Sequence, residues 1–207
     1  YETLKMINAD STLWVSDPTW PSHVGMAGHM GLKLAKYRYF DAATSTVNAA
    51  AMMEDIQGMQ PGDVLLLHGC CHNPTGANLG PDDWNALTDF VLDKGVVPFI
   101  DIAYQGFGDG LAEDAANLRM MAARVPEMLI AASCSKNFGL YRDRVGCAMA
   151  VCSSADQHAV VSRNLAVLNR LNYSFAPDHG AAAVAIILGD TALREEWEAE
   201  LDAMRDT

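Results

Sequence analysis

The chain has few charged or aromatic residues and lacks the short motifs that mark several common enzyme classes. Only 19% of its 207 residues are charged and 8% are aromatic. No G-x-G-x-x-G follows a candidate strand, and neither G-x-x-x-x-G-K-[ST] nor G-x-S-x-G occurs. The dinucleotide-binding, P-loop and serine-hydrolase classes therefore lack the phosphate-binding loop or the nucleophile turn that they require.

Long hydrophobic runs and a cysteine framework are also missing. The longest apolar stretches, near 95–103 and 181–188, are too short to cross a bilayer, and no charged region precedes them as in a signal peptide. The five cysteines are an odd number without regular spacing, which is typical of a reducing compartment. We therefore expect a soluble, cytoplasmic protein that has no membrane partner.

Basic residues are scarce: 14 Lys and Arg stand against 26 Asp and Glu, for a formal net charge of -12. This balance argues against binding to nucleic acid or to anionic membranes. A positive pocket in so acidic a chain must be local, and Lys136, Arg144 and Arg170 are its candidates. Cys70, Cys71 and His72 suggest a zinc site only weakly, because adjacent cysteines do not easily ligate one tetrahedral ion, and we expect no metal.

Half of the residues are hydrophobic and no segment is of low complexity, so the chain is ordered. Apolar runs at 13–16, 33–40, 64–68, 96–103, 128–132 and 146–152 predict strands. Helices are expected at 48–57, 81–94, 113–125, 155–170 and 177–188 and from 190 onward. This alternation predicts an α/β fold with a mostly parallel sheet that is covered by helices on both faces.

Residues with useful chemistry follow the predicted strands at their carboxyl ends. In an open parallel sheet the ligand crevice lies outside these ends. Five candidates fall there, and their shared position is a stronger argument than any one of them alone: Trp20, Asn73, Asp101, Tyr104 and Lys136.

Lys136 lies just past an apolar run, among hydroxyl side chains. Desolvation and a nearby guanidinium disfavour the ammonium form, so such a lysine can act as an amine nucleophile. Ser133, Ser135 and Arg144 together offer hydroxyl and bidentate guanidinium donors for a phosphate dianion. A lysine beside a phosphate site suggests pyridoxal phosphate. The alternative is a surface loop whose charged side chains are simply solvated.

Asp101 follows an apolar strand, so its carboxylate needs a cationic or hydrogen-bonding partner. With a pyridine-type cofactor that partner is the ring nitrogen; otherwise Asp101 is a helix cap or a structural aspartate. His23 either orients this carboxylate or is an ordinary loop histidine. Trp20 either stacks on an aromatic ring or fills the sheet edge.

Four motifs in order carry a close resemblance over nearly the whole chain. They are Ser16-Asp17-Pro18-Thr19-Trp20, His72-Asn73-Pro74-Thr75-Gly76, Asp101-Ile102-Ala103-Tyr104-Gln105-Gly106-Phe107, and Ser133-Cys134-Ser135-Lys136-Asn137-Phe138-Gly139-Leu140-Tyr141 with Arg144-Val145-Gly146. The chain resembles the aspartate and aromatic amino-acid aminotransferases, which are pyridoxal-phosphate enzymes of fold type I. The resemblance implies reversible transfer of an amino group from an amino acid to a 2-oxo acid such as 2-oxoglutarate.

The resemblance also implies roles for individual residues. Lys136 is similar to the Schiff-base lysine, which then shuttles the proton, and Asp101, backed by His23, to the partner of the pyridinium nitrogen. The remaining cofactor contacts are implied for Trp20 on the ring, Asn73 and Tyr104 at the phenolic oxygen, and Ser133, Ser135 and Arg144 at the phosphate. Asn73 also adjoins the substrate. Arg170 is similar to the arginine that one subunit of a homodimer offers to a dicarboxylate bound by the other.

One departure affects substrate choice. The family has Ser-Asn-Pro-Pro where this chain has Ser174-Phe175-Ala176-Pro177, so an asparagine beside the substrate pocket is absent. Dicarboxylate and aromatic substrates therefore both remain open. A non-catalytic scaffold is the more distant alternative.

By the same resemblance we expect 1–189 to be the central part of the cofactor-binding large domain, and 190–207 to begin a helix that leads to a small domain outside this chain. The family's N-terminal region supplies a further phosphate loop and a tyrosine from the partner subunit, and its small domain supplies an arginine for the substrate α-carboxylate. Without these parts we expect weak cofactor binding and poor turnover.

Overall fold

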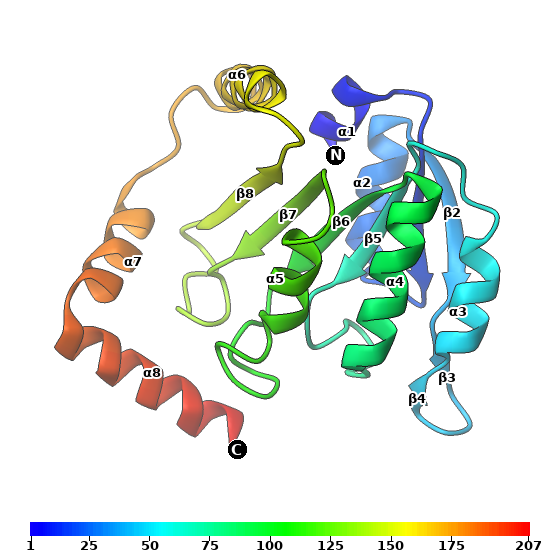
Figure 1. The fold of residues 1–207 in the computed structure, drawn as a ribbon. Coiled ribbons are helices and arrows are strands. Elements are labelled where there is room, and N and C mark those ends of the chain that lie inside the picture. The colour runs from blue at the N-terminus through cyan, green and yellow to red at the C-terminus, as the bar shows by residue number, and fades with distance from the viewer.

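A six-stranded sheet forms the centre of the computed structural model, which describes residues 1–207 (Figure 1). Its strands are β1 (Thr12–Asp17), β2 (Lys33–Arg38), β5 (Val64–His68), β6 (Val97–Ile102), β7 (Met128–Ser133) and β8 (Gly146–Val151). The order is β2-β1-β5-β6-β7-β8, in which the first five strands are parallel and β8 is antiparallel to β7. The predicted mostly parallel α/β sheet is confirmed. A separate hairpin pairs β3 (Phe40–Asp41) with β4 (Thr46–Val47).

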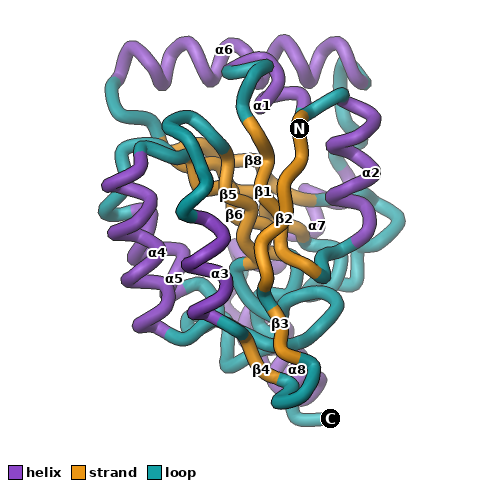
Figure 2. The backbone as a smooth tube through the Cα atoms, turned by 90° about the vertical axis from the view of Figure 1, so that its right-hand side faces the viewer, coloured by secondary structure: helices purple, strands orange, loops and turns teal.

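Helices cover both faces of the sheet (Figure 2). They are α1 (Glu2–Ile7), α2 (Pro21–Met30), α3 (Ala49–Ile56), α4 (Pro81–Lys94), α5 (Ala116–Ala122), α6 (Ala155–Asn172), α7 (His179–Gly189) and α8 (Thr191–Arg205). α3, α4 and α5 pack on one face, where they share a cluster of 20 buried residues with the sheet. α1 and α2 pack on the other face around a cluster of 8.

β5 shows how the sequence sets this two-sided packing. Leu65 and Leu67 belong to the larger cluster, whereas Val64 and Leu66 belong to the smaller one. Successive side chains of a strand point to opposite faces, so a continuous apolar run satisfies both cores at once. Burial of each such side chain contributes about 1.5–3 kcal/mol. These contacts fix the position of the carboxyl ends of the central strands relative to the helices.

α7 and α8 extend away from the sheet, but α8 returns to the loops at the strand ends (Figure 1). Leu201 is fully buried. The ring of Trp197 stacks on Phe138, with centroids 4.3 Å apart and planes 9° from parallel, and its Nε1 donates a hydrogen bond of 2.7 Å to the Asn137 carbonyl. α8 therefore covers the loop that follows β7.

Three local predictions needed correction. α1 was not expected, because its six residues are too few for a clear helical pattern. β2 ends at Arg38 rather than at residue 40, since Phe40 pairs in the β3–β4 hairpin. α5 spans Ala116–Ala122 rather than 113–125, and its start is delayed because the Asp114 carboxylate accepts hydrogen bonds from the preceding loop. No helix of the fold has the length and apolar character to cross a membrane.

Candidate functional site

A cavity of about 290 Å³ lies at the carboxyl ends of β5, β6 and β7. Eight of the ten predicted site residues line it: Trp20, Asn73, Asp101, Tyr104, Ser133, Ser135, Lys136 and Arg144. They come from strand ends and loops that are far apart in the sequence, and the parallel strands bring them together. His68, Cys70, Ala103 and Tyr141 complete the lining.

Lys136 lies in the turn that follows β7. Its Nζ is 4.7 Å from the centroid of the Tyr104 ring, over the ring face. The short antiparallel connection from β7 to β8 creates this turn, since Cys134 N donates to the Val145 carbonyl and Gly139 N to the carbonyl of Lys136. The lysine is thereby fixed at the mouth of the sheet.

Asp101 lies on β6, in register with His68 on β5 and Ala131 on β7. His23 Nε2 donates to its carboxylate oxygen Oδ2 at 2.9 Å, and the Thr19 hydroxyl lies 3.0 Å from His23 Nδ1. The side chain of His23 is only 2% exposed and that of Asp101 is 20% exposed. His23 therefore orients the carboxylate, whose remaining capacity to accept hydrogen bonds faces the cavity.

Four other polar residues of the cavity form two local pairs. Asn73 Nδ2 lies 3.5 Å from the Tyr104 hydroxyl, so both groups can donate a hydrogen bond to the same ligand atom. Ser133 Oγ accepts the Ser135 amide at 3.1 Å, which holds the two serines in one turn.

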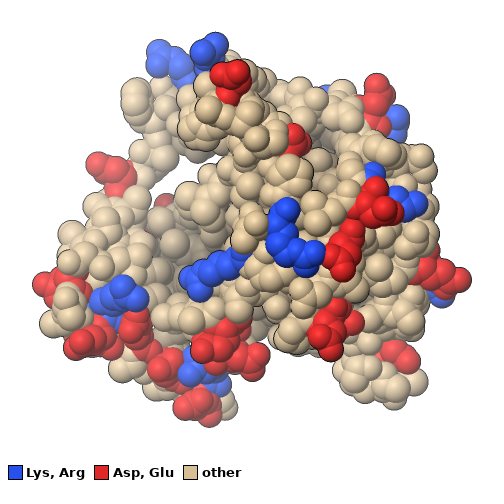
Figure 3. All heavy atoms as spheres, in the orientation of Figure 1, with Lys and Arg blue, Asp and Glu red and all other residues tan.

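Arg144 has a left-handed backbone with φ of 56°, and its Nη1 donates to the Tyr141 carbonyl at 2.8 Å. Neither Lys136 nor Arg144 takes part in any of the nine ion pairs of the chain. Their charges are therefore not neutralised by carboxylates, although acidic side chains are spread over the surface (Figure 3). The Arg144 guanidinium and the hydroxyls of Ser133 and Ser135 form a local site suited to an anion.

A family model described as "Aminotransferase class I and II" matches residues 2–207. This chain belongs to that family. It is 52% identical over 204 residues to an aromatic-amino-acid aminotransferase of Paracoccus denitrificans, covering 99% of this chain and 52% of the relative. It is 43% identical over 203 residues to an aspartate aminotransferase of Pseudomonas aeruginosa, covering 98% of this chain and 51% of the relative.

A solved structure supports the same assignment. An aromatic-amino-acid aminotransferase from Burkholderia pseudomallei, described as covalently bound to pyridoxal phosphate, superposes with a TM-score of 0.96 at 40% identity. The match covers 99% of this chain and 51% of that one. The predicted family is confirmed. The chain spans about half the length of the relatives it matches.

For this member of the aminotransferase family, two predicted residues lie outside the cavity. His23 contacts it through Asp101. Arg170 is exposed near the end of α6 and does not line the cavity. The structure thus places Arg170 apart from the other nine residues.

Sequence reasoning missed His68, which lines the cavity between His23 and His72. Its ring centroid is 5.2 Å from that of His23 and 4.3 Å from that of His72. Both ring nitrogens are buried without a hydrogen-bond partner, and this burial, the largest cause, lowers the pKa of His68 to about 3. The sequence feature that could have indicated His68 is its place as the last residue of an apolar strand.

His72 is not arranged as a metal ligand with the two cysteines. Its Nε2 lies 2.9 Å from the Ser16 hydroxyl and its Nδ1 2.8 Å from the Thr75 hydroxyl. Burial, the largest cause, lowers the pKa of His72 to about 4. It therefore ties the loop after β5 to β1 as a neutral imidazole.

Proposed function

We propose that this chain is the cofactor-binding part of a pyridoxal-phosphate-dependent aminotransferase, which moves an amino group between an amino acid, aspartate or aromatic, and a 2-oxo acid such as 2-oxoglutarate. The observation that carries the proposal is that Lys136 and Asp101 line one cavity together with Ser133, Ser135 and Arg144. An amine for the aldehyde, a carboxylate that accepts from the ring nitrogen, and an anion site for the phosphate are the groups that this cofactor requires.

The donor set fits the cofactor group by group. Arg144 and the two serines offer donors to a phosphate, and Asp101 offers a carboxylate to a protonated ring nitrogen. Trp20 lines the same cavity and presents an indole for stacking, while Asn73 and Tyr104 converge on one point for the phenolic oxygen. When bound, pyridoxal phosphate supplies an aldehyde and a ring that accepts negative charge.

Asp101 provides the electrostatic part of the mechanism. A unit charge pair at about 4 Å in an effective dielectric near 20 is worth roughly 4 kcal/mol. At about 1.4 kcal/mol for each factor of ten, this corresponds to on the order of a thousandfold in rate. His23 keeps the carboxylate aimed at the cavity through its 2.9 Å hydrogen bond.

Lys136 provides the proton transfer. Its Nζ would hold the aldehyde carbon of the cofactor, and in its free form the amine would act first as base and then as acid, moving the proton from the α-carbon of the amino acid to that aldehyde carbon. Its position over the Tyr104 ring holds the amine at the cavity mouth.

The choice of amino donor and the assembly belong to the whole protein. Relatives named for aromatic and for aspartate substrates both match. Phe175, at the departure from the family motif, is 84% exposed. We propose that this segment and Arg170 meet a second subunit in a homodimer, where Arg170 serves the partner's cavity. Leu171 and Tyr173 between them are also exposed, by 77% and 57%, which supports a covered surface there.

We also propose that 1–189 form the central part of the cofactor-binding large domain and that 190–207 lead to a small domain, so that this chain alone binds cofactor weakly. We place the protein in amino-acid metabolism of the cytoplasm, without nucleic-acid or membrane partners, in keeping with its net charge of -12.

Borohydride trapping tests the proposal. The chain is incubated with excess pyridoxal phosphate, reduced with sodium borohydride and digested with trypsin. Attachment at Lys136 blocks cleavage there, so the label is expected on a peptide spanning 125–142. Lys136→Ala should lose the label, and Lys33→Ala, altered at an exposed lysine, should keep it. Label spread over surface lysines, and unchanged in Lys136→Ala, would favour the scaffold alternative.

A further inference from the structure

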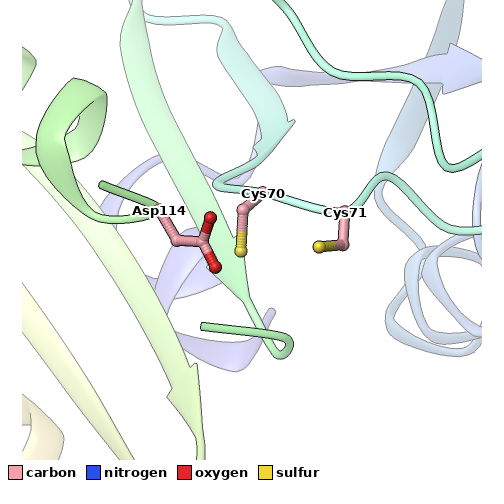
Figure 4. A group of neighbouring side chains, drawn as sticks. All are labelled: Cys70, Cys71 and Asp114. Carbon is pink, nitrogen blue, oxygen red and sulfur yellow. The ribbon is translucent and has the colours of Figure 1, made fainter. Parts of the chain in front are cut away.

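Cys70 and Cys71 are adjacent cysteines that follow β5 at the edge of the cavity. Their two sulfur atoms and a carboxylate oxygen of Asp114 all lie within 4.8 Å of one another. Figure 4 shows that the Cys71 sulfur points toward Cys70 and that the Cys70 sulfur points toward Asp114. Cys70 is 7% exposed and Cys71 is partly exposed, so a small solute reaches the second thiol first.

The third member of this group is already engaged. Asp114 Oδ2 accepts the Gly106 amide at 2.8 Å and the Gly108 amide at 3.0 Å, and its Oδ1 accepts the Asp109 amide at 2.8 Å. The carboxylate thus serves to hold the loop after Tyr104. Because adjacent cysteines do not easily share a tetrahedral ion, the cluster favours thiol chemistry over a metal.

The pKa values of the two thiols are shifted in opposite directions. The interaction between the two neighbouring thiols is the largest cause that raises the pKa of Cys70 and lowers the pKa of Cys71. Cys71 is therefore the more easily ionised thiol of the pair, and the thiolate is the reactive form. Its backbone has a φ of 46°, in the left-handed region that residues other than glycine seldom adopt.

We propose that Cys70 and Cys71 are a modification site at which a two-electron oxidant of the peroxide class joins the two sulfurs in a disulfide. The Cys71 thiolate attacks a peroxide oxygen, the O–O bond breaks, and a sulfenic acid forms at Cys71 with release of hydroxide. The Cys70 sulfur then attacks the Cys71 sulfur, the S–O bond breaks, and water leaves with the Cys70 proton. In total, two thiols and one hydrogen peroxide give one disulfide and two waters.

The modification acts on the cavity through the loop that follows. A disulfide requires the sulfurs to approach to about 2.05 Å with a defined torsion, so the backbone at 70–71 must move. Asn73 lies two residues further on and faces Tyr104, and Cys70 itself lines the cavity. Resting on the function proposed above, we infer that oxidation weakens cofactor binding and that thiol reductants restore it.

The other cysteines are less suited to this chemistry. Cys134 and Cys147 lie on neighbouring segments, but burial, the largest cause, raises the pKa of the Cys134 thiol. Cys147 is exposed and Cys152 is partly exposed, and all five cysteines are free. Peptide mapping separates the candidates, because trypsin leaves Cys70 and Cys71 on 39–94, Cys134 on 125–136, and Cys147 and Cys152 on 145–163.

The test treats the chain with hydrogen peroxide, blocks free thiols with an alkylating agent, and maps the tryptic peptides by mass. Peptide 39–94 should lose two hydrogens without joining another peptide, and dithiothreitol should reverse the change. Cys71→Ser should show no such loss, whereas Cys152→Ser should retain it. The proposal would be overturned if peptide 125–136 or 145–163 gained the mass of oxygen or became cross-linked while peptide 39–94 stayed unchanged.

Cofactor binding tests the consequence separately. The dissociation constant of pyridoxal phosphate, followed by its absorbance, should rise about tenfold on oxidation, the effect of losing one hydrogen bond. An unchanged constant in a chain whose disulfide has formed would overturn the link to the cavity. The mass change needs no cofactor, so it is observed even if the chain does not bind pyridoxal phosphate.

Discussion

His23 Nε2 lies 2.9 Å from Asp101 Oδ2, and this hydrogen bond connects the start of α2 to the end of β6 across 78 positions of sequence. The imidazole is almost completely buried, so it holds the carboxylate in one orientation. Hydrogen bonds to charged groups are worth about 1.5–3 kcal/mol. The aim of Asp101 into the cavity therefore depends on a residue that does not itself line the cavity.

Substitutions at this pair should separate charge from orientation. Asp101→Asn removes the charge, and we expect a loss on the order of a thousandfold in kcat of the full-length protein, following the roughly 4 kcal/mol of charge interaction. His23→Leu removes the orienting hydrogen bond and should cost about tenfold to a hundredfold. His23→Gln, which keeps an N–H donor, should recover part of this loss. Equal rates for His23→Leu and the unaltered protein would contradict the role of the pair.

Arg144 should discriminate between forms of the cofactor. Arg144→Gln removes a charged donor to the phosphate, so the dissociation constant of pyridoxal phosphate should rise about tenfold to a hundredfold. Pyridoxal, which has no phosphate, should bind the variant and the unaltered chain alike. Arg142→Gln is the matched control, because Arg142 is exposed nearby and does not line the cavity. A parallel loss for both ligands would show that the substitution damages the fold instead.

The buried histidines make stability depend on pH. The pKa of His68 is about 3 and that of His72 is about 4 in the folded chain, both lowered from 6.5. Between these values and 6.5 the unfolded state binds more protons than the folded state. The free energy of unfolding is therefore highest above pH 6.5 and falls as the pH drops toward 4. Each histidine contributes a slope of about 1.4 kcal/mol per pH unit.

Urea unfolding at pH 7.5 and pH 5.5 measures this dependence. The free energy of unfolding should fall by roughly 2–3 kcal/mol between the two conditions. His68→Gln should remove about half of that fall, and His158→Gln, altered at an exposed residue, should leave it intact. A pH-independent free energy of unfolding would mean that both rings are hydrated in solution.

α8 should stabilise the loops around the cavity mainly through Leu201. This side chain is fully buried, and a leucine-to-alanine change at such a site costs about 2–5 kcal/mol. Leu193→Ala, on the same helix at a side chain that is 40% exposed, should cost within about 0.5 kcal/mol. Urea unfolding of both variants at pH 7.5 compares them. Similar small losses at both positions would show that α8 is detached from the body of the protein in solution.

Much of the site was predictable because the relevant signals are local. Apolar runs marked β5, β6 and β7, and the rule that parallel strands present their carboxyl ends together placed Asn73, Asp101 and Lys136 at one edge. The same rule placed Trp20 and Tyr104, and the hydroxyl and guanidinium donors near Lys136 pointed to Ser133, Ser135 and Arg144.

The parts that were missed depend on contacts between distant segments. The stacking of Trp197 on Phe138 joins residues that no local pattern relates. The sequence marks His68 only as the end of an apolar strand, because its unpartnered ring nitrogens become evident only when His23 and His72 are packed beside it. The start of α5 was wrong for a similar reason, since the Asp114 carboxylate turns back to the loop before it.

The central claim is that the amine of Lys136 and the carboxylate of Asp101 hold the same cofactor. Its most direct measurement is a crystal structure of the chain grown with pyridoxal phosphate. We predict density continuous with Lys136 Nζ in the 290 Å³ cavity, with the ring nitrogen at hydrogen-bond distance from Asp101. Cofactor bound elsewhere, or a ring in the cavity that reaches only one of the two residues, would contradict the account.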